Sequence, residues 1–398
     1  MSTVNQSIKP LLFGFYFYRL LRFSYFHIAI GILYFQSCGL TLVQSLSVES
    51  VYYVAKSAFD LPGGYFADRL GRKSSLLTSS LICAAAFLTI GLSSTYAMFA
   101  FASGMLGLAM SLATSSDSAL IYDELQARHA LSHYEKAEAR GWGMRNFGFA
   151  VASAAGAWIA AKSTLAVAFF LTAGVVAAST LFVMRYMHEP HFRGVANRGS
   201  WLKAMREMAE QPRFYSTVAF FAVIFVVGRI GFWAFQPILS YLGTDTKWFG
   251  VLFGLTLFVT MFAALRIEWM HRVRGGPWVV LGTLCSTCFL IIGLGVAMGG
   301  VLGFLVAMLG FLVHAVALGL YDPAMRRNIN DMAHGSVRAS AISVVTTIGN
   351  LGFAAFAPIF GYLIERVGHA PTLFGIGLVT TGLTTAFVRW QALNGTLE

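Results

Sequence analysis

Charged residues are scarce in this chain: only 11% of its 398 residues are Asp, Glu, Lys or Arg, whereas 57% are hydrophobic. Soluble domains carry about 25% charged and about 45–50% apolar residues, so this composition excludes an ordinary soluble protein. Apolar runs of about 20 residues, the length that an α-helix needs to cross a bilayer, recur from end to end. The sequence therefore predicts an all-α, multi-pass membrane protein that lies in the lipid bilayer.

Motifs for enzymatic and cofactor chemistry are missing. There is no Walker motif, so ATP is not the direct energy source, and no G-x-S-x-G or H-E-x-x-H pattern offers a nucleophile or a zinc site. The "HEPH" run at 188–191 contains a proline and lacks helical spacing, so we interpret it as part of a solvated linker. Cys285 and Cys288 have C-x-x-C spacing, but no His or second Cys pair accompanies them. We expect no enzymatic activity, no metal and no other cofactor.

Positive charge is distributed unevenly along the chain. The net charge of +11 alone would suit a nucleic-acid-binding protein, but Lys and Arg gather in alternate segments between the apolar runs. One side holds most of them, and the other holds only Lys162, Lys247 and Arg366. The positive-inside rule makes the first side cytoplasmic and places both termini there. We expect a protein of the bacterial inner (cytoplasmic) membrane with no nucleic-acid partner.

The apolar runs predict twelve membrane-spanning helices. Their ranges are 11–36, 41–67, 73–92, 96–124, 138–160, 164–186, 214–242, 248–270, 277–298, 301–325, 338–364 and 372–390. The longest polar segment follows the sixth range. We therefore divide the chain into an N-terminal six-helix bundle at 1–187, a cytoplasmic central linker at 188–213 and a C-terminal six-helix bundle at 214–398.

The two halves resemble each other at corresponding places. Span four ends with Tyr122 and Asp123, and span ten ends with Tyr321 and Asp322, which follow 199 positions later. The run "RNFGFA" at 145–150 is repeated as "GNLGFA" at 349–354. Weak internal repeats of this kind are common in transporters. They indicate a duplicated six-helix bundle.

The stretch "DLPGGYFADRLGRK" at 60–73 contains the most specific motif. Its part "GYFADRLGRK" resembles the loop motif G-x-x-x-D-R-x-G-R-K of the major facilitator superfamily. "DLPGG" and "SSDSALIYDEL" (115–125) resemble patterns of a bacterial drug- and metabolite-antiporter-like group of that family. The resemblance implies a monomeric secondary transporter with twelve helices in two pseudo-symmetric bundles. It also implies alternating access and a small-molecule substrate.

The same resemblance implies a conformational gate that latches one state of the transporter. The gate residues are Gly64, Asp68, Arg69, Gly71, Arg72 and Lys73, with Asp123 at the end of span four. Gly71 permits a tight turn, and the basic side chains bond phosphates or carboxylates. The alternative is that the basic residues only set the membrane orientation.

Ionisable groups inside spans are costly and mark functional candidates. The candidates for proton coupling are Asp60, Asp117, His27 and His314. The candidates for the substrate cavity are Arg22, Arg145, Arg229, Trp233 and Gln236.

Purely structural roles for these residues remain open as alternatives. Asp60 lies four residues from Lys56, which suits a simple ion pair. Arg229 suits pairing with Asp60 or Asp117, and each histidine suits a plain hydrogen-bond donor. Arg19 and Arg22 are placed to snorkel to the cytoplasmic interface. Pro237 is expected to break the seventh span.

Two family motifs are incomplete. Span four lacks the arginine of the proton-coupling motif, and "GFAVASAAGA" at 148–157 lacks the proline of the antiporter motif. The leading hypothesis is proton-coupled export (antiport) of small amphipathic molecules, either drugs or metabolites. The alternative is proton-coupled uptake of a small organic solute such as a siderophore or an organic anion.

Overall fold

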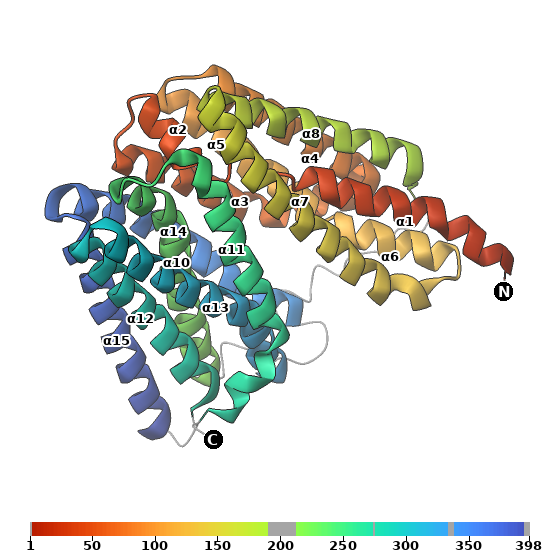
Figure 1. Cartoon of the computed structure of the whole chain (residues 1–398). Helices are drawn as coiled ribbons and strands as arrows, with labels where there is room; N and C mark the ends of the chain where they lie inside the picture. The colour runs from red at the N-terminus through yellow and green to blue at the C-terminus, as the bar shows by residue number, and fades with distance from the viewer. Residues whose placement is uncertain (1, 190–211, 274, 333–337, 394–398) are drawn as a thin grey trace. The chain divides into compact units, whose positions relative to one another are not determined.

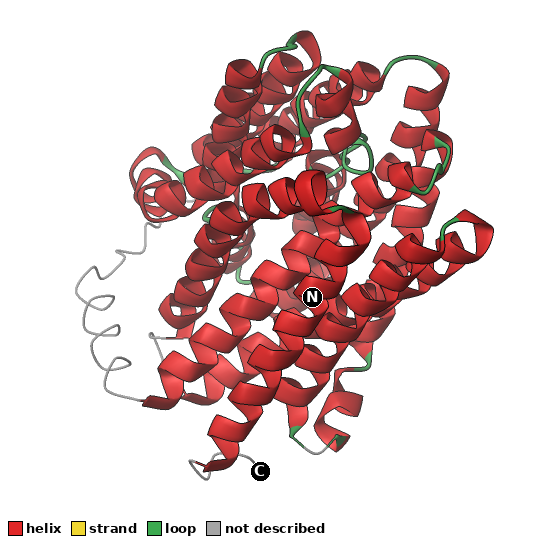
Figure 2. Ribbon diagram, turned by 90° about the vertical axis from the view of Figure 1, so that its left-hand side faces the viewer, coloured by secondary structure: helices red, strands yellow, loops and turns green. Residues whose placement is uncertain are grey.

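The computed structural model describes residues 2–189, 212–273, 275–332 and 338–393. Within these ranges the regular structure is entirely helical, and no strand occurs (Figure 2). Nine helical segments of the described residues are long and apolar enough to cross a membrane. The other three predicted spans coincide with helices that carry more polar residues, and each of the twelve predicted ranges overlaps a helix.

The chain divides into two compact units (Figure 1). The first comprises 1–40, 47–196 and 245–254, and the second comprises 41–46, 197–244 and 255–398. Two helices, α3 and α11, therefore begin in one unit and continue in the other. Most of the predicted linker, residues 190–211, lies outside the described residues.

The helices before the linker have the following bounds: α1 Ser2–Arg22, α2 Gly31–Ser37, α3 Leu42–Leu70, α4 Arg72–Leu92, α5 Tyr96–Thr114, α6 Asp117–Ala127, η1 Leu131–His133, α7 Tyr134–Lys162 and α8 Leu165–Tyr186. Those after it are α10 Pro212–Tyr241, α11 Thr246–Leu265, η2 Ile267–Arg272, α12 Gly276–Met298, α13 Gly300–Met332, α14 Arg338–Val367 and α15 His369–Leu393.

The surface of α13 illustrates the lipid-exposed character of these helices. Val301, Leu305 and Leu309 are four residues apart and 79%, 57% and 54% exposed, so they form one apolar stripe. An exposed apolar face of this kind is unusual on a monomeric soluble protein and suits contact with lipid chains. Both the outward apolar surface and the composition indicate a membrane protein.

The first predicted span is not one helix, which corrects the range 11–36. α1 ends at Arg22, α2 begins at Gly31, and the segment between them is irregular. Irregular backbone at membrane depth is tolerated only where protein or water satisfies its polar groups. Here the Phe26 N–H donates a hydrogen bond to Thr172 Oγ1 of α8 at 3.0 Å. Hydropathy predicts the apolar run but carries no information about this partner.

Two further expectations about continuity were wrong. The range 96–124 is split between α5 and α6 at Ser115 and Ser116. The hydroxyl of Ser115 donates to the Ser111 carbonyl at 3.1 Å, and such local bonds compete with helix continuation. Conversely, Pro237 does not end α10, which continues to Tyr241. Prolines near the end of a membrane helix are tolerated where neighbouring groups satisfy the freed carbonyl.

Three glycines allow α7 to pack directly on α1 and on the irregular segment after it. A Cβ at Gly148 or Gly156 would collide with the carbonyl oxygens of Leu20 and Phe26, respectively, and one at Gly141 would meet Arg19. Small residues serve membrane helices in this way because they let backbones approach closely. The small-residue run in α7 therefore has a packing role in this chain.

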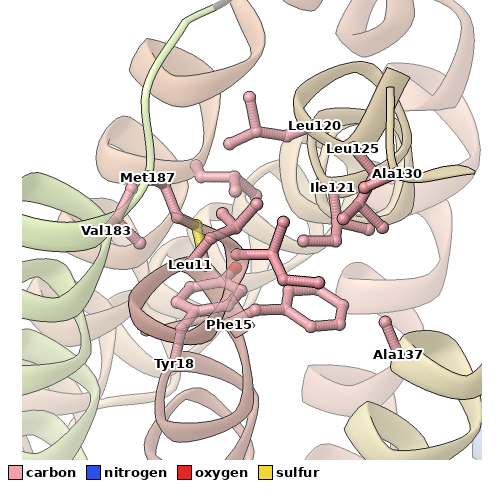
Figure 3. Packing of buried hydrophobic residues seen from close by; sticks show 12 residues of the cluster. Leu11, Phe15, Tyr18, Leu120, Ile121, Leu125, Ala130, Ala137, Val183 and Met187 are labelled. Atoms are coloured by element: carbon pink, nitrogen blue, oxygen red, sulfur yellow. The ribbon is translucent and has the colours of Figure 1, made fainter. Parts of the chain in front are cut away.

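A buried apolar cluster joins the ends of several helices in the first unit (Figure 3). Leu11 and Phe15 of α1 lie against Leu120 and Ile121 of α6, and Met187 follows α8. This packing fixes the end of α1 that carries Arg19 and Arg22.

Candidate functional site

The motif at 60–73 forms the end of α3 and the start of α4. Gly71 separates the two helices with a φ of 98°, in the left-handed region that glycine adopts readily. The Arg72 guanidinium binds the Asp123 carboxylate and donates to the Ala119 carbonyl at 2.8 Å. The structure thus brings together two of the predicted gate residues, and it links α4 to α6.

The Glu189 side chain caps the N-terminal end of α4. Its carboxylate accepts the backbone N–H groups of Arg72 at 2.9 Å and Lys73 at 2.7 Å, and Lys73 Nζ donates to the Met184 carbonyl at 3.1 Å. A carboxylate stabilises a helix N-terminus because the unpaired N–H groups and the dipole are positive there. Sequence reasoning assigned Glu189 to a solvated linker and missed this role.

The neighbouring histidine of the "HEPH" run is not placed as a metal ligand. The His188 backbone N–H donates to Glu124 Oε1 at 2.8 Å. Loss of hydration, together with the charges of Lys73 and Arg128, lowers the pKa of His188. Among the described residues, no group of three or more His, Cys, Asp or Glu could hold a metal ion.

The remaining gate candidates lie in the last turns of α3. The guanidinium of Arg69 is exposed and stacks over the Tyr65 ring at 4.5 Å. Gly64 and Asp68 belong to the same helix, but their surroundings fall outside the described part of the structure.

Arg19 is the centre of a buried ionic cluster in the first unit. Its guanidinium contacts Asp117 at 3.1 Å, Glu138 at 2.8 Å and the Ser118 hydroxyl at 2.9 Å. Arg19 is 3% exposed, so it does not snorkel to an interface. Asp117, a predicted proton-coupling residue, is therefore one of two carboxylates bound to a buried cation.

Arg22, one turn further along α1, lacks such compensation. Its side chain is 0% exposed, which corrects the snorkelling expectation for this residue as well. It donates to the Tyr25 hydroxyl at 2.7 Å and to the Ser79 hydroxyl at 3.4 Å. No described carboxylate contacts it, and its Nε has no acceptor among the described residues. Arg22 is a buried cation held by neutral groups.

Arg145 of α7 lies beside the same site. Its guanidinium stacks over the rings of Phe23 at 4.1 Å and Trp142 at 4.6 Å, without an ion pair to a described carboxylate. The Arg22 guanidinium lies 5.6 Å from the centroid of the same Phe23 ring, so the two cations are less than about 10 Å apart. The sequence placed both residues in a substrate cavity, and the structure brings them together.

Aromatic rings surround this pair of cations. Tyr25 packs against His27, Phe87 and Phe149, with ring centroids 5.6, 5.5 and 6.0 Å apart. His27 itself stacks on Phe169 at 4.8 Å. Both arginines therefore lie among aromatic side chains at the break between α1 and α2.

His314, a proton-coupling candidate, lies in the second unit. His314 is 4% exposed, and its Nε2 donates to the Gly228 carbonyl at 2.9 Å. A carbonyl only accepts, so this nitrogen carries a proton in the neutral ring. A Cβ at Gly231 would collide with the same ring. The imidazole is packed between helices as a hydrogen-bond donor.

The cavity candidates of α10 differ in exposure. Arg229 is half-buried and stacks over Phe225 at 5.1 Å and Phe232 at 5.9 Å. Trp233 and Gln236 are only 7% and 2% exposed. Of these three, Arg229 alone presents a partly accessible polar group.

The last candidate, Asp60, is bound locally. Lys56 Nζ lies 2.7 Å from Asp60 Oδ2, as the spacing of four residues suggested. The pair is compact and electrically neutral.

The matching family model decides the classification. The sequence matches the model described as Major Facilitator Superfamily over residues 12–357. The chain belongs to this superfamily. It is thus a secondary transporter rather than an enzyme, which confirms the predicted fold class and the absence of an enzymatic role.

Several proteins with solved structures share this fold, and their names give different solutes. A nucleoside transporter, NupG, has a TM-score of 0.77 at 13% identity, with 98% of this chain and 100% of that chain covered. A peptide transporter in complex with sulfate has a TM-score of 0.75 at 14% identity (96% and 94% covered), and a D-xylose–proton symporter has 0.70 at 12% (96% and 96% covered). Curated proteins gave no significant sequence match. At such identities the likeness supports the fold alone.

Proposed function

We propose that this member of the superfamily takes up a small organic anion together with protons, by alternating access. The observation that carries the proposal is the pair Arg22 and Arg145, two shielded cations that form no ion pair with a described carboxylate. An unpaired Arg at the centre of a membrane costs about 2.5–3.5 kcal/mol on insertion scales. Arg19 provides the internal comparison, because that cation has two carboxylate partners.

An anionic ligand would supply the charge that is missing from this site. Guanidinium groups bind carboxylate and phosphate through charge-assisted hydrogen bonds that are about twice as strong as neutral ones. Tyr25, Phe87 and Phe149 add apolar and aromatic surface beside the cations. We therefore expect a substrate that joins an anionic group to an apolar or aromatic part.

The charge of the substrate determines how uptake is driven. An inside-negative membrane potential opposes entry of an anion by about 2.3 kcal/mol per charge at 100 mV, so uptake needs a co-transported cation such as the proton. Export of an anion needs no such coupling, and cationic amphipathic drugs would be repelled by Arg22 and Arg145. Proton-coupled export is the second candidate, favoured by the "SSDSALIYDEL" pattern of the antiporter-like group.

The proposal includes the gate and the setting of the protein. Arg72, Asp123 and Glu189 hold the motif at 64–73 in the arrangement described above, which supports a latch for one conformation. We place the protein in the bacterial inner membrane as a monomer with both termini in the cytoplasm, on the basis of its charge distribution.

Thermal unfolding of the purified protein with a panel of compounds tests the substrate class. The panel contains aromatic carboxylates, dicarboxylates, sugar phosphates, neutral nucleosides and cationic amphipaths. A ligand at 100 times its dissociation constant stabilises a protein by about 2.7 kcal/mol, which raises the unfolding temperature measurably. We expect stabilisation by one class of anion in the wild type but not in Arg145→Gln. Arg140→Gln, at an exposed site on the same helix, is the matched control and should behave as the wild type.

The opposite pattern would refute the proposal. Two results would exclude a role of Arg22 and Arg145 in substrate binding. One is stabilisation by cationic amphipaths alone, and the other is an anion that stabilises Arg145→Gln as much as the wild type. The direction of transport is then measured in liposomes with the stabilising compound. Uptake driven by an imposed proton gradient supports the first candidate, and efflux exchanged for protons supports the second.

A further inference from the structure

The α3 helix carries a stripe of ionisable residues that sequence reasoning registered only in part. Glu49, Lys56 and Asp60 are separated by seven and four residues, which places them within about 40° of one another around the helix axis. Charged residues inside membrane helices almost always face protein or water rather than lipid. Sequence reasoning considered Lys56 and Asp60 and overlooked Glu49, although Glu49 interrupts the same predicted span.

Glu49 is the one described carboxyl group that is partly buried and has no partner. It is half-buried, and among the described residues it has neither an ion pair nor a hydrogen bond. Glu135 and Glu268 also lack a partner, but both are exposed. The remaining acidic side chains that the structure describes each have one: Asp60, Asp117, Asp123, Glu124, Glu138, Glu189, Asp245, Asp322, Asp331 and Glu365.

The helix packed on this part of α3 does not neutralise Glu49. α5 lies so close that a Cβ at Gly107 would collide with the backbone at Tyr52 and Lys56, and the Ser47 hydroxyl donates to the Tyr96 hydroxyl at 3.3 Å. α5 contains no Asp, Glu, Lys, Arg or His. Tyr96 is its only ionisable group, and that hydroxyl accepts the hydrogen bond from Ser47.

The charged groups described beside this part of α3 do not pair with Glu49. On α3 itself, Lys56 is bound to Asp60. Arg145 of α7 lies within electrostatic range of Tyr52, one turn after Glu49, but no interaction joins Arg145 to Glu49.

We infer that Glu49 is the carboxyl group that binds the coupling proton. An unpaired carboxylate is costly in a membrane, and one proton converts it to a neutral acid. The carboxylate takes up a proton on one side and returns it on the other, so one positive charge crosses per cycle. Asp60 and Asp117 suit this task less, because each already holds a cation.

That the proton bound by Glu49 is the coupling proton rests on the proposed function, in which a proton enters together with the anion.

Infrared difference spectroscopy of the full-length protein in liposomes tests the inference without any substrate. Lowering the pH should produce the C=O stretching band of a neutral carboxylic acid in the wild type. We expect Glu49→Gln to lose this band, and Glu135→Gln, a matched change at an exposed glutamate, to retain it. An unchanged band in Glu49→Gln would overturn the inference.

A second variant protects the test against misfolding. If thermal unfolding shows that Glu49→Gln is not folded, Glu49→Asp keeps a carboxyl group on a shorter side chain. Its band should appear at a shifted frequency and a shifted pH midpoint, and an unshifted band would again overturn the inference. Because no ligand is used, failure of the anion panel refutes only the proposed function and leaves this result interpretable.

Discussion

At the scale of single residues, two arginines on one helix show what a sequence does and does not reveal. Arg19 and Arg22 are three residues apart and both are buried, yet only Arg19 has carboxylate partners. Their presence inside a span marked them as candidates. The difference between them depends on residues about a hundred positions away in the chain, which no local pattern encodes.

Stability measurements should separate the two arginines. Arg19→Gln leaves Asp117 and Glu138 shielded without their cation, and breaking such a buried pair costs about 3–5 kcal/mol. Arg22→Gln loses two hydrogen bonds worth about 1 kcal/mol each but also removes an unpaired charge, so the net change should be smaller. Thermal and denaturant unfolding in detergent measure both, with Arg140→Gln as the control. Equal losses for Arg19→Gln and Arg22→Gln would contradict the assignment of their partners.

At the scale of helices, the apolar runs predicted where helices lie but not where they break. The interruption at 23–30 depends on the bond from Phe26 to Thr172, and the one at Ser115 and Ser116 depends on a side-chain hydroxyl. The small residues of α7 were noticed because of an antiporter motif. Their contacts show a different requirement, which is space for the carbonyl groups of Leu20 and Phe26.

Two alanine substitutions on α7 test this requirement. Gly156→Ala should lower the unfolding temperature and the yield of folded protein, because its Cβ would meet the Phe26 backbone, which cannot move aside easily. Gly143→Ala meets no atom within 4 Å and should be neutral or stabilising by up to about 1 kcal/mol, because alanine favours the helix. Circular dichroism during heating compares the two. A tolerated Gly156→Ala would mean that α7 and the irregular segment after α1 are not in close backbone contact.

At the scale of the whole molecule, the superfamily fold was predictable because span count, charge distribution and the motif at 64–73 agree. Glu49 and Glu189 were missed for different reasons. Glu49 was overlooked within a predicted span, while Glu189 lies in a polar segment whose position against α4 emerges only in the folded chain. The proposed membrane orientation rests on the positions of Lys and Arg alone and has a direct test.

Cysteine labelling in intact cells checks this orientation. Cys38 is partly exposed and is first replaced as Cys38→Ser, and the other native cysteines, Cys83, Cys285 and Cys288, are buried, so background labelling should then be low. Cysteine is introduced at exposed positions as Ser132→Cys, before α7, and Lys247→Cys, in the first turn of α11. A membrane-impermeant maleimide should label Lys247→Cys in intact cells and Ser132→Cys only after permeabilisation. The reverse pattern would invert the topology.

The ionic cluster around Arg19 has a consequence for biosynthesis. α1 enters the membrane with Arg19 and Arg22, while Glu138, a partner of Arg19, follows 119 positions later. At about 5–20 residues per second, the ribosome needs about 6–24 s to produce that partner. Asp117, the other carboxylate partner of Arg19, is made earlier, 98 positions after it. The ionic cluster that shields Arg19 is therefore complete only after synthesis has reached the fifth predicted span.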